Sequence, residues 1–303
     1  MIKKQARGIA VAGAVLAEKS IDPQSGLPRI SCAGSVSDIA MMLKTLSPRL
    51  PVSAIGCVGD DPEGRYIANR LRTAGVETSG LKTVPDQQTG FLQDTLDQGA
   101  AGEFGVCDVI FRDLRCKILH LGDFLALEKI TDGDGRNILK HARQWGIQTS
   151  LSIFDGSSQR YAAVLAALPR TDYLIVSLSH GAKLTNMEEN SDHLEKIARQ
   201  LLWYGVKKKV FIYSPDWVIC CNKTQSYRLG NYILPDFAAS NEAQGQAAFC
   251  AGVLNGLCSG WGDMKILETA TACAAAKQCG AQTASVQNME DDCKQLKRHK
   301  KVL

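Results

Sequence analysis

Two stretches of the sequence combine glycine with polar side chains in the way that small-molecule sites do. Residues 33–38, Ala-Gly-Ser-Val-Ser-Asp, place a glycine and a carboxylate at the start of an amphipathic pattern. Residues 244–247, Gln-Gly-Gln-Ala, precede an alanine-rich helical pattern, and Glu242 is the nearest carboxylate. Backbone N–H groups at the start of a helix attract anions. We therefore expect Gly245 and the N–H groups after it to form a weak anion site.

The 11 cysteines and five histidines show no spacing typical of metal ligands. There is no CxxC pair, the cysteine count is odd, and most cysteines lie within apolar patterns. A free cysteine in such a position behaves as a small hydrophobe. We expect free thiols, a reducing cytoplasmic location and no metal site formed by these residues.

Length and composition predict one large α/β domain. The chain has 303 residues, of which 45% are hydrophobic and 22% charged, enough to form a substantial core. No apolar run approaches the roughly 18–20 residues that a membrane span needs. The basic N-terminus leads into an apolar run that we interpret as a first strand rather than a signal peptide.

The net charge of +4 is concentrated in the C-terminal tail, residues 294–303. This tail holds five basic residues and no acidic ones, so the rest of the chain carries a net charge of −1. A neutral body argues against a nucleic-acid partner. We expect the tail to be the solvated end of the last helix, with contact to a polyanion as the less favoured interpretation.

Short apolar runs alternate with amphipathic stretches along most of the chain. Glycines that follow three of these stretches are typical helix stops. The last part, 241–280, is helical throughout. This alternation predicts a parallel sheet with helices on both faces and ligands at the carboxyl ends of its strands. The expected strands are 8–15, 51–59, 116–122, 149–155, 172–177 and 208–214, and the expected helices are 37–46, 62–75, 135–146 and 191–205.

The order of several motifs resembles the ribokinase-like (PfkB) carbohydrate kinase family. The most specific of them is GCVGDDPEGRYIANRLRTAGVETSGL at 56–81, and SCAGSVSDIAMMLKTL, Thr89-Gly90, CKILHLG and LPDFAASNEAQGQAAFCAGVLNGL also match. The resemblance implies an α/β fold with a mostly parallel central sheet in a single domain, residues 1–293. It also implies a reduced β lid, with abbreviated pieces near 18–31 and 89–105. Family members use ATP and a divalent cation to phosphorylate a hydroxyl of a sugar or nucleoside.

The catalytic signature of that family is altered in this chain. When the sequence is anchored on Phe249, Ala247 occupies the place of the general-base aspartate of GAGDxF, and Gln244 and Gln246 replace its glycines. Alanine cannot accept a proton, and general-base catalysis is typically worth about 10²- to 10⁴-fold in rate. Two added Cβ atoms would also hinder phosphate approach to the turn around Gly245. The resemblance thus gives a degenerate phosphate site and no catalytic residue.

Two further family sites depart from their patterns. Ser177 and His180 stand where the family has the NxxE motif that organises metal and phosphate, and a serine and a histidine suit Mg²⁺ poorly. For His180 we favour a surface-loop position over a catalytic role. With Gln244, Gly245 and Gln246, these two residues form the expected degenerate nucleotide site.

The substrate-binding residues that the resemblance implies are Glu18, Gly34, Asp38 and Gly99. Asp38 replaces the asparagine of GGxxxN, and its role as a helix cap is an equally weighted alternative. Glu18 matches the acidic residue expected at the end of the first strand, although a solvated loop charge is the simpler interpretation. Two acidic groups favour a polyhydroxylated or amine-bearing ligand.

These departures predict a pseudokinase that binds a small sugar- or nucleoside-like ligand or a partner. The alternative is an active, divergent kinase that uses ATP and Mg²⁺, with water, Asp236 or Glu242 as the base. A structural role as a homodimer is the third hypothesis, and the shortened lid argues against the dimer that family lids build.

Overall fold

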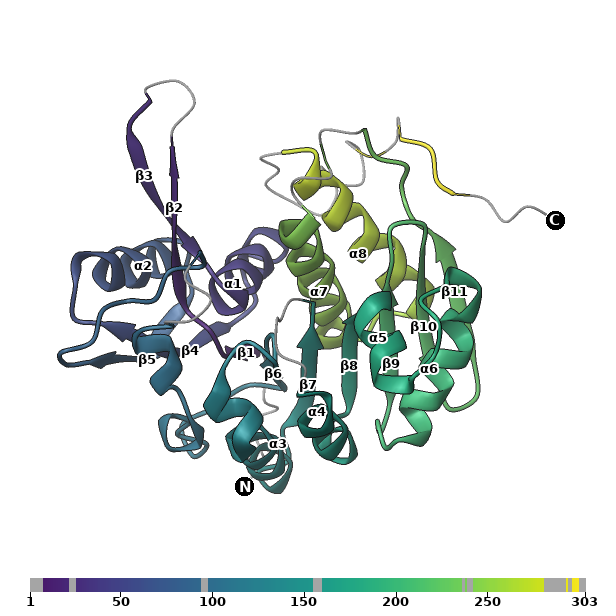
Figure 1. Ribbon diagram of the computed structural model, residues 1–303, viewed down its shortest axis with the longest axis horizontal. Helices are drawn as coiled ribbons and strands as arrows, with labels where there is room; N and C mark the ends of the chain where they lie inside the picture. Colours follow the sequence, from purple (N-terminus) through teal and green to yellow (C-terminus); the bar gives the residue numbers. More distant parts are fainter. Residues whose placement is uncertain are drawn as a thin grey trace.

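The computed structural model describes residues 8–21, 26–93, 98–154, 160–235, 238, 242–280, 293 and 296–299. Its centre is a nine-stranded sheet of order β11-β10-β9-β8-β7-β6-β1-β4-β5 (Figure 1). The strands from β9 to β5 in this order are parallel, whereas β10 pairs antiparallel with both β9 and β11. The bounds are β1 (Ile9–Ala12), β4 (Val52–Gly59), β5 (Glu77–Val84), β6 (Ile118–Leu121), β7 (Gln148–Ile153), β8 (Tyr173–Ser177), β9 (Lys209–Tyr213), β10 (Trp217–Asn222) and β11 (Ser226–Gly230).

Helices cover both faces of the sheet, as its fully buried strands β1, β6 and β8 require. One hydrophobic core packs the first face against α1 (Ser35–Leu46), α2 (Pro62–Thr73), α7 (Glu242–Ser259) and α8 (Asp263–Gln278). A second core packs the other face against α3 (Gly135–Gln144), α4 (Tyr161–Ala167), α5 (Leu178–Thr185) and α6 (Leu194–Trp203). The expected α/β architecture with a mostly parallel sheet is confirmed.

A two-stranded hairpin, β2 (Leu16–Ile21) and β3 (Pro28–Ala33), stands apart from the main sheet (Figure 1). It connects the end of β1 to the start of α1 and therefore lies over the carboxyl ends of the parallel strands. One isolated bridge, between Ala17 and Phe91, joins it to the 89–91 segment. This hairpin is the reduced β lid that we expected.

The C-terminal tail differs from its prediction where the structure describes it. Residues 296–299 lie beside the segment that follows β11 instead of extending a helix. The Arg298 guanidinium donates to the carbonyl of Gly230 at 2.9 Å and lies 3.8 Å from the centre of the Tyr232 ring. The expectation of a solvated helix end is wrong for these residues, because a planar guanidinium can stack on an aromatic face and donate hydrogen bonds at once.

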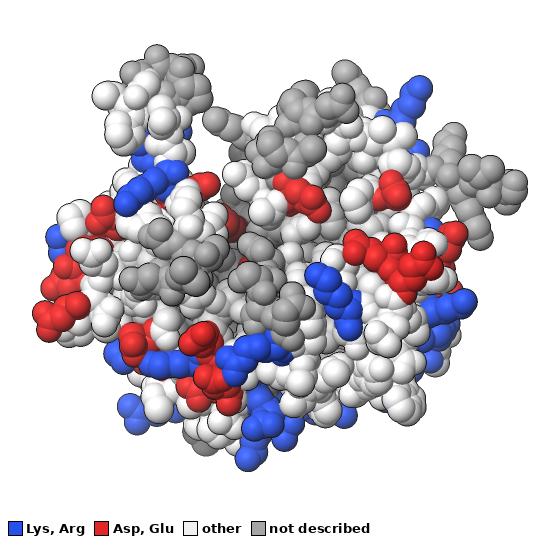
Figure 2. All heavy atoms as spheres, viewed as in Figure 1, with Lys and Arg blue, Asp and Glu red and all other residues white. Residues whose placement is uncertain are grey.

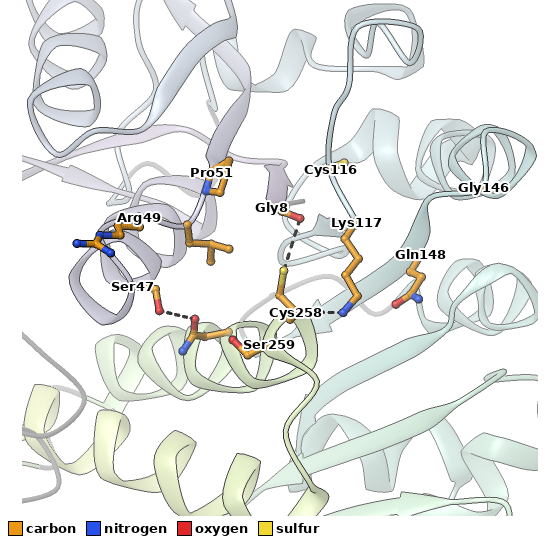
Figure 3. A pocket seen from close by; sticks show the side chains of 12 residues that line it. Gly8, Ser47, Arg49, Pro51, Cys116, Lys117, Gly146, Gln148, Cys258 and Ser259 are labelled. Carbon is orange, nitrogen blue, oxygen red and sulfur yellow. Dashed lines mark hydrogen bonds between the residues drawn. The ribbon is translucent and has the colours of Figure 1, made fainter. Parts of the chain in front are cut away.

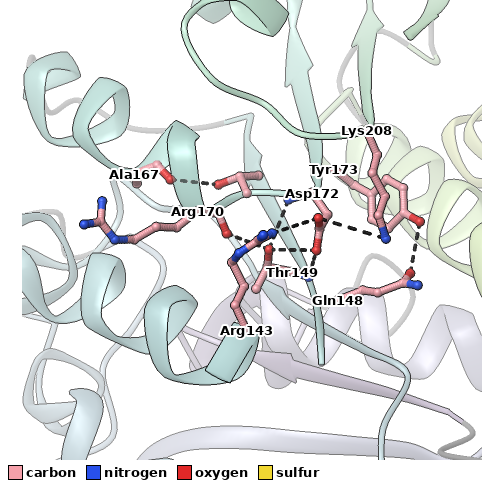
Figure 4. A network of polar contacts seen from close by, with 9 residues as sticks. Arg143, Gln148, Thr149, Ala167, Arg170, Asp172, Tyr173 and Lys208 are labelled. Carbon is pink, nitrogen blue, oxygen red and sulfur yellow. Dashed lines mark hydrogen bonds and ion pairs between the residues drawn. The ribbon is translucent and has the colours of Figure 1, made fainter. Parts of the chain in front are cut away.

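A polar network fixes the amino ends of β7 and β8, opposite the lid (Figure 4). Asp172, 5% exposed, accepts hydrogen bonds from the Arg143 guanidinium at 2.9 Å and from the Thr149 backbone N–H at 3.0 Å. The Tyr173 hydroxyl donates to the side-chain oxygen of Gln148 at 3.0 Å. Since every buried polar atom named here has a partner, the network holds this edge rigid.

Charge is distributed over the surface without a continuous basic region on the face shown in Figure 2. Acidic and basic side chains alternate there, in keeping with the near-neutral body that the sequence indicates. Among the helices that the structure describes, none is long and apolar enough to span a bilayer. All eleven cysteines are free thiols.

Candidate functional site

The lid hairpin, α1 and the carboxyl end of β6 bring three carboxylates together. Glu18 lies on β2, where it accepts a hydrogen bond from the Ser31 hydroxyl at 3.3 Å across the hairpin. Asp38 lies in the first turn of α1 and is influenced electrostatically by Glu18, Asp123 and Lys277. Three acidic groups and one ammonium thus influence one another beneath the lid, and we call this region the lid cleft.

Burial raises the pKa of Asp38 to about 7, with Lys277 opposing the shift and Glu18 and Asp123 adding to it. The physical cause is that the protein around Asp38 replaces water, so that the charged carboxylate is less well solvated. Near neutral pH, Asp38 therefore exchanges readily between a neutral hydrogen-bond donor and a charged acceptor.

Asp123 was missed by the sequence analysis. It follows β6 and has a positive φ of 43°. Its side chain accepts a hydrogen bond from the Phe154 backbone N–H at 3.2 Å, and its own N–H donates to the Ser152 hydroxyl at 3.1 Å. These bonds tie the ends of β6 and β7 together and hold Asp123 in the cleft.

Gly34 and Gly99, two of the expected substrate-binding residues, are required by the backbone conformation beside the lid. Gly34, with φ of 83°, precedes α1, and a Cβ there would lie 2.7 Å from the carbonyl oxygen of Ala14. Gly99, with φ of 50°, pairs with Thr89 beside the lid, and a Cβ there would meet the carbonyl of Gln88. Both positions need a residue without a side chain. Asp38 is not the cap of α1, since Gly34 occupies that position.

The start of α7 differs from the glycine-rich turn that the resemblance implies. Glu242 is already helical, so Gly245, Gln246 and Ala247 lie within the first two helical turns. In an α-helix the N–H groups beyond the first four bond to carbonyls within the helix. The anion site expected from the N–H groups after Gly245 is therefore not formed.

Side chains also occupy the space around this turn. Gln246 is buried at 8% exposure and donates to the Glu242 carboxylate at 3.0 Å. A Cβ on Gly245 would come within 2.5 Å of the Gln278 side chain, which packs against the helix. Gln244 is exposed, and Ala247 is partly buried with an apolar methyl group. No proton acceptor stands at position 247.

Ser177 and His180 meet at the start of α5. The Ser177 hydroxyl caps the helix by accepting the His180 backbone N–H at 3.3 Å. The His180 ring is 6% exposed, and its Nδ1 lies 2.9 Å from the Tyr161 hydroxyl. The expected surface-loop position of His180 is wrong, because α5 turns this side chain into the protein.

Two adjoining cavities lie above α5 and α7. The larger has a volume of about 570 Å³ and includes Ser177, His180, Glu189 and Gln246 in its wall. The smaller, of about 300 Å³, is bordered by Asp216 and Gln278, and Glu242 faces both. Among the residues that the structure describes, neither wall includes a lysine or arginine, whereas acidic groups are present in each. The region above α7 is thus open and is not filled by Gln246. Because its described walls carry acidic groups and no lysine or arginine, it attracts anions poorly.

A buried chain of polar atoms supports α7 from below. The His120 ring bridges the Ser150 hydroxyl, 3.0 Å from Nδ1, and the Cys250 thiol, 3.5 Å from Nε2. Burial lowers the pKa of His120 to about 3 and raises the pKa of the Cys250 thiol. Both groups are neutral at physiological pH, and we assign them to packing.

The structure places the predicted residues in two groups. Glu18, Gly34, Asp38 and Gly99 belong to the lid side, and Ser177, His180, Gln244, Gly245 and Gln246 to the α5–α7 side. Glu18 is on the lid and not at the end of β1, which stops at Ala12. Asp236 lies outside the described residues. Among those described, no group of three or more His, Cys, Asp or Glu side chains could hold a metal ion.

Known structures share this architecture. A PfkB protein from Polaromonas sp. JS666 is 19% identical with a TM-score of 0.78, and the match covers 93% of this chain and 99% of that one. Ribokinase from Arabidopsis thaliana in complex with ribose and ATP is 17% identical with a TM-score of 0.75, over 95% and 99% of the two chains. A putative ribokinase II from E. coli in complex with ATP and Mg²⁺ is 18% identical with a TM-score of 0.74, over 94% and 98%.

Such low identities establish the fold alone. No curated protein matches the chain. The sequence model of the pfkB family carbohydrate kinases, however, matches residues 29–229, which is more than half of the chain. The chain therefore belongs to the pfkB family of carbohydrate kinases.

Proposed function

We propose that this protein binds a small sugar- or nucleoside-like ligand beneath the β2–β3 lid without transferring a phosphoryl group to it. The observation that carries the proposal is Ala247, set on a helical backbone where the family has its aspartate. Gln246, bonded to Glu242, occupies the neighbouring position in place of a glycine. The deprotonation of an attacking hydroxyl has no base at this place.

The lining of the two cavities also argues against binding of ATP and Mg²⁺. Phosphate groups are stabilised by cations and by free N–H groups. Here Glu189 and Glu242 border the larger cavity, and the described wall holds no lysine or arginine. His180 is already engaged with Tyr161. These residues do not fit a metal–nucleotide complex, so we derive no chemical step through one.

The lid side, by contrast, keeps features of a ligand site. Glu18, Asp38 and Asp123 supply carboxylate acceptors, and Lys277 supplies a donor. Hydroxyl and amine groups donate to such acceptors, whereas a phosphorylated ligand would be repelled. We therefore propose a polyhydroxylated or amine-bearing ligand for this cleft.

Two measurements on the full chain test the proposal. A thermal-shift series with ribose, fructose, adenosine and glucosamine should reveal a ligand that raises the melting temperature, and Asp38→Asn should reduce that shift. The matched control is Glu128→Gln, at an exposed carboxylate outside the cleft. A coupled ATPase and sugar-phosphorylation assay with ATP and Mg²⁺ should stay at the no-enzyme blank. Turnover well above that blank would refute the proposal.

The alternative function is a divergent kinase in which Glu242 serves as the base. Its support is the position of Glu242, which borders both cavities one helical turn before Gln246. This alternative requires that millimolar ATP and Mg²⁺ raise the melting temperature and that Glu242→Gln abolish turnover. Asp236 is the second candidate base, and water is the third.

A homodimer remains a prediction. Ile21 and Leu27, on the lid hairpin, are 71% and 64% exposed, and the hairpin projects from the body (Figure 1). Exposed apolar side chains on a projecting two-stranded hairpin favour contact with another chain. Light scattering of the wild type and of an Ile21→Glu variant measures whether the hairpin mediates association.

A further inference from the structure

A larger cavity lies at the opposite edge of the sheet from the lid (Figure 3). Its volume is about 680 Å³, within the ~300–1,000 Å³ range of small-molecule sites. The starts of four neighbouring strands, β7, β6, β1 and β4, form its floor, and the ends of α1 and α7 close its sides. We call it the amino-edge cavity, and the residues used below are Ser47, Arg49, Lys117, Gln148 and Asn255.

The charged residues of this cavity are both cationic. Arg49 is exposed and has no hydrogen bond or ion pair within the part of the chain that the structure describes. The Lys117 ammonium donates to the carbonyls of Leu257 and Cys258 at 3.1 and 2.8 Å. An ammonium has three N–H bonds, so one remains for a ligand. Neither aspartate nor glutamate is found in the described wall, which therefore favours an anion.

Asn255 adds a buried side-chain amide with one unsatisfied atom to the same wall. Its side chain is 1% exposed, and its oxygen accepts the Ser47 hydroxyl at 2.9 Å. Its amide nitrogen has no partner among the described residues. Rotation of the amide by 180° would leave the oxygen unpaired instead, so either orientation leaves one amide atom without a hydrogen bond. Buried donors without partners are rare because their desolvation is uncompensated.

Gln148 supplies a further positioned donor on the other side of the cavity wall. The oxygen of Gln148 is held by the Tyr173 hydroxyl, within the polar network at the starts of β7 and β8 (Figure 4). The side-chain NH₂ group of Gln148 can then act as a donor, since a fixed oxygen fixes the amide. Leu50 and Pro51 supply an apolar portion of the wall. The cavity thus combines several donors, two cations and an apolar surface.

We propose that the amino-edge cavity binds a small organic anion whose phosphate or carboxylate group accepts a hydrogen bond from Lys117, while Arg49 adds positive charge at the rim of the cavity. The site is separate from the cleft beneath the lid, which is acidic and suits the opposite charge. Carboxylates and phosphates share the chemistry that the site recognises, which is acceptance of several N–H bonds by a charged oxygen group.

Isothermal titration of the full chain with inorganic phosphate, ribose 5-phosphate and citrate tests this site and identifies the preferred group. We expect at least one of the three to bind with millimolar or tighter affinity. Arg49→Glu should weaken that binding at least about tenfold, because it reverses one of the two positive charges of the cavity. Asn255→Leu, close in size to the wild-type side chain, should weaken it several-fold while circular dichroism reports a folded protein.

The matched control is Arg136→Glu, which makes the same charge change at an exposed position at the other end of α3 from the cavity. Its affinity should equal that of the wild type. The inference is overturned if none of the three anions binds at about 10 mM, or if Arg49→Glu and Arg136→Glu bind equally well. Equal binding would place the anion elsewhere in the protein.

Discussion

Replacing Asp38 with asparagine should stabilise the protein at alkaline pH and have little effect in acid. Asp38 has its pKa raised from 3.8 to about 7 by burial. A carboxyl group with a raised pKa stabilises the fold below its unfolded pKa, and this contribution is lost as the pH rises through the folded value. At pH 8 the wild type therefore carries the full cost of a charged, poorly solvated Asp38. Asparagine keeps the shape without the charge.

The size of this effect follows from the shift. About three pKa units at about 1.4 kcal/mol each set an upper limit near 4 kcal/mol. Because Asp38 remains partly accessible to water, we expect about half, or about 2 kcal/mol. For a chain of this length that corresponds to a rise of about 3 °C in melting temperature.

Melting curves from about pH 4 to pH 8 measure the difference between the wild type and Asp38→Asn. The difference should be near zero at the acidic end and grow through neutrality. Lys277→Met in the wild-type background should deepen the loss at pH 8, since Lys277 opposes the shift. Glu128→Gln, at an exposed carboxylate, should follow the wild type. A pH-independent difference, or a less stable Asp38→Asn at pH 8, would refute the reasoning.

Three further changes probe the scaffold around the cleft. Gly245→Ala should cost about 1–3 kcal/mol, because its Cβ would come within 2.5 Å of the buried Gln278 side chain. Gly262→Ala, with open space around it, is the control in denaturant unfolding. Asp61→Ala should cost about 2–3 kcal/mol, because its carboxylate caps α2 and accepts two bonds from Thr89. His120→Gln should reduce the loss of stability that acid causes.

The direction in which pH changes the effect of Asp61→Ala and of His120→Gln on stability follows from their pKa shifts. The pKa of Asp61 is lowered, since hydrogen bonds from Thr89 and Gly64 outweigh its partial burial. Its contribution is therefore present above its unfolded pKa and declines in acid, so Asp61→Ala and the wild type should converge there. The pKa of His120 falls from 6.5 to about 3. Stability should drop by about 2 kcal/mol between pH 6.5 and 5 in the wild type, and less in His120→Gln. Parallel curves would contradict both assignments.

The sequence predicted the main sheet because its strands are continuous apolar runs. All six expected strands exist, as do the helices after them, with ends that differ by a few residues. The lid strands β2 and β3 were expected only from the family resemblance, because Glu18, Lys19 and Arg29 interrupt any apolar pattern on this hairpin. β5, β10 and β11 were missed. β5 and β11 are edge strands, and their exposed faces weaken the apolar signal on which strand prediction depends. β10 lies between β9 and β11 and is apolar and buried, so its signal was present in the sequence.

The candidate site was predicted only where a motif carried it. Asp38 and the residues of α5 and α7 were found from the resemblance to family motifs, whereas Asp123 and Lys277 come from the ends of β6 and α8. Nothing local distinguishes these two residues. They meet Asp38 because the strand order places β6 beside β1, and because α8 packs against α7. A cluster of charged residues that are far apart in the sequence and meet only through the fold cannot be predicted from local sequence patterns.

The early start of α7 has a consequence for how the family's chemistry relates to this chain. An aspartate restored at position 247 would stand on a backbone whose N–H groups are already committed to helical carbonyls. Recreating an anion cradle would require the first helical turn to unwind and Gln246 to leave its bond with Glu242. The departure from the family motif therefore involves main-chain N–H groups as well as side chains. An aspartate at position 247 alone would add a carboxylate without adding free N–H groups for a phosphate beside it.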